Sequence, residues 1–195
     1  LGHWSFIMVT HKPLLIISGP SGVGKSYLDK QLKLSGLQPV LKTTTRNMRM
    51  GEVNGVDYEF LTAAQYINIR STSTDFVTDS DFFGAYYAVR QSEIDKIWAD
   101  GKIPYMYIYI GVIETFVEAF PYSRRVYLMP RDIELIERRL KQRDGDKYNI
   151  RLKAAKAEIV MFDGGKNKFY HKTIPVVDDD TGPIVQALLG EASDL

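Results

Sequence analysis

The segment Gly19-Pro20-Ser21-Gly22-Val23-Gly24-Lys25-Ser26 directly follows the apolar residues 14–17 and one serine. It has the G-x-x-x-x-G-K-[ST] pattern of a loop that binds the phosphates of a nucleoside triphosphate. Glycine lets backbone N–H groups turn toward phosphate oxygens, because no Cβ stands in the way. In this pattern Lys25 reaches the β- and γ-phosphates, and the Ser26 hydroxyl takes a place on Mg²⁺. A glycine-rich turn can also be a simple connection, but a lysine and a serine at two fixed places add nothing to a turn.

The composition is that of an ordinary globular domain. The chain has 195 residues, of which 45% are hydrophobic and 25% are charged, enough for one substantial core. A formal net charge of +1 gives no global attraction to nucleic acid or to a membrane surface. Cysteine is absent, which excludes disulfides and thiolate metal sites and favours a cytoplasmic location. No apolar run approaches the ~20 residues that span a bilayer, and the three histidines show no metal-ligand spacing.

Residues 1–12 form an additional segment whose role the sequence leaves open. Residues 4–9 are apolar, but no basic leader precedes them and no small-residue cleavage site follows, so we do not expect a signal peptide. A remnant of cloning, an alternative start and an extra packed strand all fit this segment. The sequence also leaves a monomer and a homodimer open.

Strands and helices alternate along the chain, which predicts an α/β domain. We expect strands at 14–17, 105–110, 126–129 and 173–177, and helices ending near 33 and over 91–99, 113–120, 132–143, 149–162 and 184–189. This alternation favours a parallel sheet covered by helices on both faces. A polar segment of about 43–90 interrupts it, with a short helix at 63–69, strands at 82–83 and 86–89, and a turn or hairpin at Asn54-Gly55. We interpret this segment as an insertion beside the phosphate loop.

Two pairs of arginines are candidates for phosphate chemistry. Arg46 and Arg49 are three residues apart, and two guanidinium groups from one loop can clamp a terminal phosphate, although exposed arginines are also common surface residues. Arg143 and Arg151 flank a glycine-containing break, which suits a mobile lid. Arg143 can equally complement the dipole at the end of its helix. We interpret the remaining basic residues Lys12, Arg124-Arg125 and Arg138-Arg139 as solvated charge.

The order of these motifs resembles the guanylate kinase family. The phosphate loop is followed by Thr44-Thr45-Arg46, Arg49 and the segment 51–58, which is more specific than the loop alone. The resemblance continues at 84–87, 101–102, 143, 151–158 and 178–179, and covers 13–190 in the family's order.

This resemblance implies a P-loop NTPase-type fold with a core of about 13–42 and 91–190, an acceptor-binding insertion of about 43–90 and a lid of about 143–151. It implies the reaction of ATP and GMP to give ADP and GDP, with Mg²⁺ as cofactor. The acceptor would be held by Arg46, Arg49, Tyr58, Tyr87 and Thr78. The phosphoryl group in flight would be stabilised by Lys25, Arg46, Arg143 and Arg151.

The sequence departs from the family at several acceptor positions. Thr78 replaces a glutamate that reads guanine, Lys42 replaces a serine, and Tyr107 and Tyr109 replace two aspartates. Ala88-Val89 and Val177 also differ from the family's residues. These changes keep two alternatives open: a kinase of another phosphorylated acceptor, and a non-catalytic module that binds a protein partner. The module reading predicts a decayed phosphate loop, whereas Lys25 and Ser26 are both present here.

Overall fold

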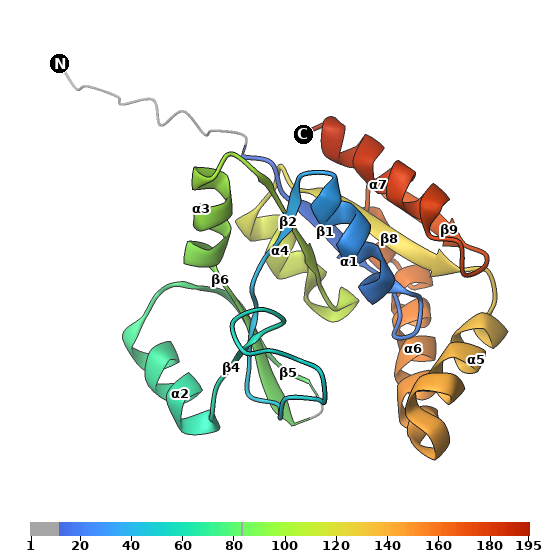
Figure 1. The fold of residues 1–195 in the computed structure, drawn as a ribbon, viewed down its shortest axis with the longest axis horizontal. Helices are drawn as coiled ribbons and strands as arrows, with labels where there is room; N and C mark the ends of the chain where they lie inside the picture. The colour runs from blue at the N-terminus through green and yellow to red at the C-terminus, as the bar shows by residue number, and fades with distance from the viewer. Residues whose placement is uncertain (1–11, 83) are drawn as a thin grey trace.

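The large sheet of the protein has five parallel strands, with the strand that precedes the phosphate loop in the middle. In the computed structural model, which describes residues 12–82 and 84–195, the strand order is β2-β7-β1-β8-β9 (Figure 1). The strands are β1 Leu15–Ser18, β2 Leu37–Pro39, β7 Ile103–Tyr107, β8 Arg124–Pro130 and β9 Lys172–Val176. All four residues of β1 are fully buried, which explains why its first three residues are apolar without alternation.

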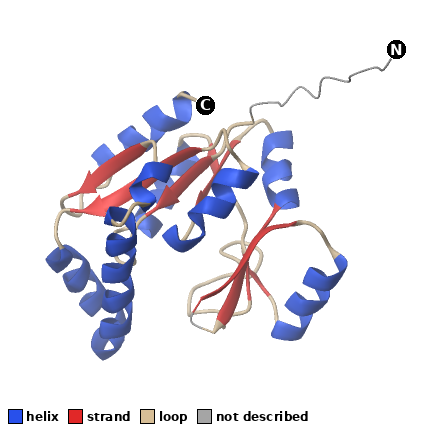
Figure 2. Ribbon diagram, turned by 180° about the vertical axis from the view of Figure 1, so that it is seen from behind, coloured by secondary structure: helices blue, strands red, loops and turns tan. Residues whose placement is uncertain are grey.

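Helices cover both faces of the large sheet (Figure 2). Leu15 and Ile17 pack in one core cluster with residues of α1 Lys25–Leu34, α5 Ile133–Asp144, α6 Tyr148–Asp163 and α7 Gly182–Ser193. Leu14 and Ile16 pack in the other with residues of α3 Gln91–Ala99 and α4 Ile113–Ala119. Successive side chains of a strand point to opposite faces, so one short run supplies both cores. Three short 3-10 helices complete this part of the chain: η1 Ile110–Val112, η2 Gly145–Lys147 and η3 Lys166–Phe169.

A small sheet of four strands stands beside one end of the large sheet (Figure 1). Its strands are β3 Thr43–Thr44, β4 Glu59–Phe60, β5 Phe76–Phe82 and β6 Ala85–Arg90, in the order β4-β3-β6-β5. The helix α2 Ala63–Thr72 packs on it through Tyr66, which stacks on Tyr86 with ring centroids 4.9 Å apart. Thr62 and Gln65 form a capping box that starts this helix.

The α/β fold class predicted from the sequence is confirmed, but some details were wrong. The strand expected over 105–110 ends at Tyr107, because the chain turns into η1 and the N–H of Val112 bonds to the carbonyl of Tyr109 at 3.1 Å. The turn at Asn54-Gly55 forms without a hairpin, since Asn54 bridges Tyr58 in parallel. The short strands β2 and β4 were not predicted. The expectations for residues 1–11 and for Phe83 lie outside the described residues.

No helix among the described residues combines the length and the apolar character needed to cross a membrane.

Candidate active site

The phosphate loop connects the central strand β1 to α1. Gly22 and Gly24 adopt positive φ angles of 86° and 111°, which favour glycine. The buried side chain of Val23 anchors the loop in the core. Gly24 is the N-cap of α1, has no side chain that could bond to the N–H groups of the first turn, and lines the cleft together with Lys25 and Ser26. A helix start with available N–H groups and a positive dipole end is an anion-binding element.

Gly19 is required for a different reason, namely the close approach of the loop to β8. A Cβ on Gly19 would lie 2.8 Å from the carbonyl oxygen of Leu128 and 3.0 Å from its Cβ. Both atoms belong to the rigid strand β8, so neither can move aside without displacing the strand. The first glycine of the motif therefore sets the distance between the loop and the sheet.

The Gly19→Ala variant is expected to lower the free energy of unfolding by roughly 1–3 kcal/mol, as overpacking of a close contact does. The control is Gly190→Ala, because Gly190 lies in α7 and a Cβ there would meet nothing within 4 Å. That control should be neutral or stabilising by up to about 1 kcal/mol. Chemical denaturation measures both, and equal stability of the two variants would contradict this account of Gly19.

The partly buried Lys25 and the buried Glu158 are two ionisable groups of the site that act on each other's charge. The Lys25 ammonium donates to the carbonyl oxygens of Gly19 and, at 3.1 Å, of Pro20. Burial lowers the pKa of Lys25 to about 8, against the opposing attraction of Glu158. Burial raises the pKa of Glu158 to about 7, against the opposing effects of Lys25 and of a hydrogen bond from the backbone of Ser21. The Glu158 side chain comes from α6, so this helix places a carboxyl group beside Ser21 and Lys25 of the phosphate loop.

The raised pKa of Glu158 predicts a pH-dependent stability. The folded state holds the proton of Glu158 up to about pH 7, whereas an unfolded chain releases it near 4.5. The unfolding free energy is therefore expected to decrease as the pH rises between these two values, by on the order of 1–3 kcal/mol. Glu158→Gln should make the curve flatter in this window. Denaturation at pH 4.5, 5.5 and 7 measures the slope, and parallel curves for wild type and variant would rule out this contribution of Glu158.

A cleft of about 960 Å³ contains nearly all the predicted site residues. It is walled by the phosphate loop, the carboxyl end of β7, the small sheet and the corner where α5 is followed by α6. The predicted residues that line it are Gly19, Ser21, Gly22, Val23, Gly24, Lys25, Ser26, Arg46, Arg49, Tyr58, Thr78, Tyr87, Arg143 and Arg151. Pro20 is the exception and contributes its carbonyl oxygen to Lys25. Arg46 and Arg49 thus share one cavity with Lys25.

Arg46 is held in place by a carboxylate that the sequence analysis did not single out. Its guanidinium makes a two-pronged ion pair with Glu52, with N–O distances of 2.6 and 2.5 Å. The second oxygen of Glu52 also accepts the backbone N–H of Arg49 at 2.8 Å. The Arg46 guanidinium lies 5.0 Å from the ring centroid of Tyr58, which packs edge-on to Tyr87. Glu52 therefore orders the segment that carries both arginines.

Arg143 and Arg151 share a second carboxylate. Arg143, near the end of α5, bonds to Asp144 at 2.8 and 3.0 Å, and Arg151 of α6 lies 3.4 Å from the same side chain. These arginines hold the pKa of Asp144 below its usual value, the Arg143 hydrogen bond contributing most. Burial, Arg143 and Arg49 in turn lower the pKa of Arg151. The charges of Arg143 and Arg49 therefore act on Arg151.

Two arginines interpreted as solvated charge are in fact structural. Arg139 lines the cleft and donates to the carbonyl of Val23 at 2.8 Å and to Asp179 at 2.7 Å. Its position four residues after the core residue Leu135 places it on the buried face of α5, a signal present in the sequence. Arg125 is 8% exposed and donates to the carbonyls of Ser123 and Phe169. Arg138, by contrast, is exposed as expected and pairs weakly with Asp179.

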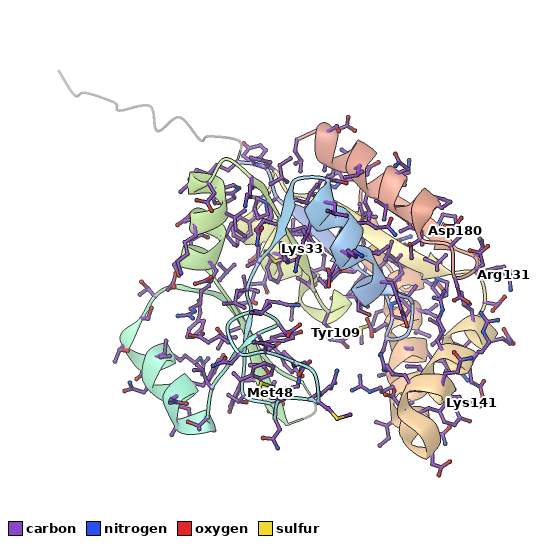
Figure 3. The ribbon with its side chains drawn as sticks, viewed as in Figure 1. Lys33, Met48, Tyr109, Arg131, Lys141 and Asp180 are labelled. Carbon is purple, nitrogen blue, oxygen red and sulfur yellow. The ribbon has the colours of Figure 1, made fainter. Side chains whose placement is uncertain are left out.

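Two tyrosines stand in the cleft at the carboxyl end of β7. Burial and the nearby Asp29 raise the pKa of Tyr107, and burial with Glu158 raises that of Tyr109, so both phenols are neutral near pH 7. In Figure 3, Tyr109 lies at the lower edge of the large sheet, on the side where the small sheet stands. At this edge of the cleft the tyrosine side chains themselves therefore carry no negative charge.

The described part of the chain holds no group of three or more His, Cys, Asp or Glu side chains that could bind a metal ion. The exposed hydroxyl of Ser26 faces the cleft next to Lys25. Mg²⁺ commonly takes few protein ligands and completes its shell with phosphate oxygens and water. The residues present fit a magnesium ion that arrives with a nucleotide.

Comparisons with known proteins agree with this geometry. The sequence model of the guanylate kinase family matches residues 11–178. Guanylate kinase of Prochlorococcus marinus is 30% identical over 167 residues, covering 83% of this chain and 88% of that protein. Guanylate kinase of Nostoc sp. is 29% identical over 180 residues, covering 90% and 86%. The crystal structure of guanylate kinase from Anaplasma phagocytophilum has the same fold, with a TM-score of 0.73 at 22% identity, covering 94% of this chain and 85% of that one. The chain belongs to the guanylate kinase family.

Proposed function

We propose that this protein is an ATP-dependent guanylate kinase, which converts ATP and GMP into ADP and GDP. The observation that carries the proposal is the cleft in which a complete phosphate loop shares one cavity with Arg46 and Arg49. Two anionic substrates need two positively charged ends of one cavity, and the loop and these arginines supply them. The family relationship supports both the donor and the acceptor.

ATP is bound at the phosphate loop. The N–H groups of the loop and the start of α1 receive the phosphates, and Lys25 leaves the carbonyl oxygens of the loop to contact the β- and γ-phosphates. Ser26 would hold Mg²⁺, which when bound with ATP neutralises charge on the phosphates. Lys25 and the loop then fix the γ-phosphoryl group in the cleft.

GMP is bound at the side of the cleft that the small sheet forms. Arg46 and Arg49 hold its phosphate, with hydroxyl groups from Tyr58 and Tyr87, and Thr78 lies on the wall where the base is expected. An oxygen of this phosphate forms the new bond to the γ-phosphorus as the bond to the β-phosphate oxygen breaks. Charge spreads over the γ-phosphoryl oxygens in the transition state, so fixed cations accelerate the step.

Arg143 and Arg151 add two positive charges that stabilise the negative charge on the transferring phosphoryl group. In this proposal the corner of about 143–151 acts as the lid, residues 43–90 as the acceptor-binding insertion, and about 13–42 and 91–190 as the core. Closure of the corner would bring both guanidinium groups over the phosphoryl group and exclude water.

The experiment is a coupled assay of ADP release with Mg-ATP and a panel of GMP, dGMP, AMP, UMP, CMP and sugar phosphates. GMP is expected to give the highest kcat/KM. A different preferred acceptor would indicate a kinase of another phosphorylated compound. ATP binding without any turnover would indicate a non-catalytic module that binds a protein partner. The intact loop and the family relatives do not favour either alternative. A cytoplasmic location and the choice between a monomer and a homodimer stay predictions from the sequence.

A further inference from the structure

Lys42 lies where the two sheets meet. It precedes β3 of the small sheet, and its ammonium donates to the carbonyl oxygen of Tyr107, the last residue of β7, at 3.0 Å. The same ammonium lies 5.2 Å from the centroid of the Tyr58 ring. The Lys42 side chain therefore faces the cleft, between a residue of the large sheet and a residue expected to contact the acceptor.

The charge of Lys42 is not neutralised by the protein in the way that the arginine charges are. Arg46 is paired with Glu52, Arg143 with Asp144 and Arg139 with Asp179. Among the described side chains, no carboxylate forms an ion pair with Lys42, whose contacts are the carbonyl oxygen of Tyr107 and the ring and hydroxyl of Tyr58. An ammonium group has three donors, and the carbonyl of Tyr107 and the hydroxyl of Tyr58 engage two of them. One donor and a full charge remain for a ligand.

The position of this charge indicates which part of a ligand it meets. Lys42 and Arg46 both lie about 5 Å from the centroid of the Tyr58 ring, at 5.2 and 5.0 Å. The Coulombic effect of Lys42 is the main cause that lowers the pKa of Tyr58. Lys42 also lowers the pKa of Lys25, after the larger effects of burial, which lowers it, and of Glu158, which raises it. Its charge thus acts on the region between the two ends of the cleft, where the phosphates of both substrates meet.

We propose that Lys42 binds the phosphate of the acceptor, as a cation in addition to Arg46 and Arg49. The inference rests on the proposed function, because it takes these arginines as the acceptor's phosphate site. A compact point charge that pivots on a flexible stem suits a phosphate oxygen, whose position changes as the new bond forms.

Lys42→Met tests the proposal, since methionine keeps the apolar stem against Tyr58 and removes the charge. The KM and the calorimetric Kd for GMP are expected to rise by about 10- to 100-fold, the effect of losing a hydrogen bond to a charged group. The affinity for guanosine, which has no phosphate, should change less than about twofold on the same scale. Lys42→Arg should restore most of the GMP affinity. Lys102→Ala, an exposed lysine at the opposite end of β7, should change nothing.

Two outcomes would overturn the proposal. One is an unchanged GMP affinity in Lys42→Met, and the other is an equal loss for GMP and guanosine, which would mean that Lys42 contacts the base. ATP affinity measured on the same samples reports whether the variant is folded. Should Lys42→Met fail to fold, Lys42→Gln keeps a donor for Tyr107 without the charge and carries the same comparison.

The proposed function can fail without deciding the role of Lys42. If the wild type prefers another monophosphate in the coupled assay, that compound and its dephosphorylated form replace GMP and guanosine in the titrations. A phosphate-dependent loss then supports Lys42 while GMP specificity is rejected. Failure of the wild type to bind any monophosphate of the panel would overturn both the proposed function and the proposed role of Lys42.

Discussion

Replacing Lys25 with methionine is expected to lower kcat by on the order of 10³-fold or more, with little change in stability. The Lys25 ammonium is the cation of the phosphate loop itself, and its contacts to the carbonyls of Gly19 and Pro20 hold it at the loop's centre. The charge that develops on the γ-phosphoryl oxygens would lose its nearest fixed partner. The unfolding free energy should not fall, because burial already opposes the charge of this group and methionine fills similar space.

The measurement is single-turnover ADP formation at saturating Mg-ATP and GMP, combined with chemical denaturation. Lys30→Met is the matched control, since Lys30 is exposed on the same helix and does not line the cleft. A Lys25→Met enzyme with wild-type kcat would show that Lys25 takes no part in the mechanism. It would also contradict the interpretation of the loop as a catalytic element.

Replacing Arg46 with alanine is expected to lower kcat/KM for GMP by on the order of 10²- to 10³-fold. The loss has two parts. The acceptor phosphate loses a guanidinium partner, and Glu52 is left as an unpaired anion in the cavity where that phosphate must bind. Arg46→Lys should recover only part of the rate, because one ammonium cannot make the two-pronged contact to Glu52.

The double variant Arg46→Ala/Glu52→Gln separates these two parts. Removing the carboxylate charge should restore some of the acceptor affinity lost in Arg46→Ala, and the remaining deficit measures the direct contact to phosphate. The apparent KM for ATP should stay within about threefold of wild type in all three variants. A loss that falls on ATP instead of GMP would assign Arg46 to the donor side.

The fold was predictable because the strongest local signals agree with its architecture. Residues 14–17 are apolar without alternation, as expected for a strand covered on both faces, and the helix after the loop begins at Lys25 as the motif requires. The strands β2 and β4 were missed because three and two residues are too few to show a pattern. Their strand geometry is imposed by their neighbours, through the pairing of Leu37 with Ile103 and of Glu59 with Thr43.

The members of the candidate site were predictable mainly as cations, and their carboxylate partners were not. Lys25 was identified from the phosphate-loop pattern, and Arg46 and Arg143 from their positions in the order of motifs that resembles the family. Glu52 and Asp144 were identified only from the structure, since an acidic residue near an arginine is common on any surface. The buried Glu158 likewise depends on how α6 packs against the loop, which no local pattern reveals.

The shared carboxylate of Asp144 has a mechanical consequence. It is the final residue of α5 and contacts guanidinium groups from both α5 and α6, so it ties the tips of two helices across η2. In the proposed lid, this shared contact would couple a movement of Arg143 to a movement of Arg151. We infer that closure of the proposed lid would deliver the two positive charges together, and not one after the other.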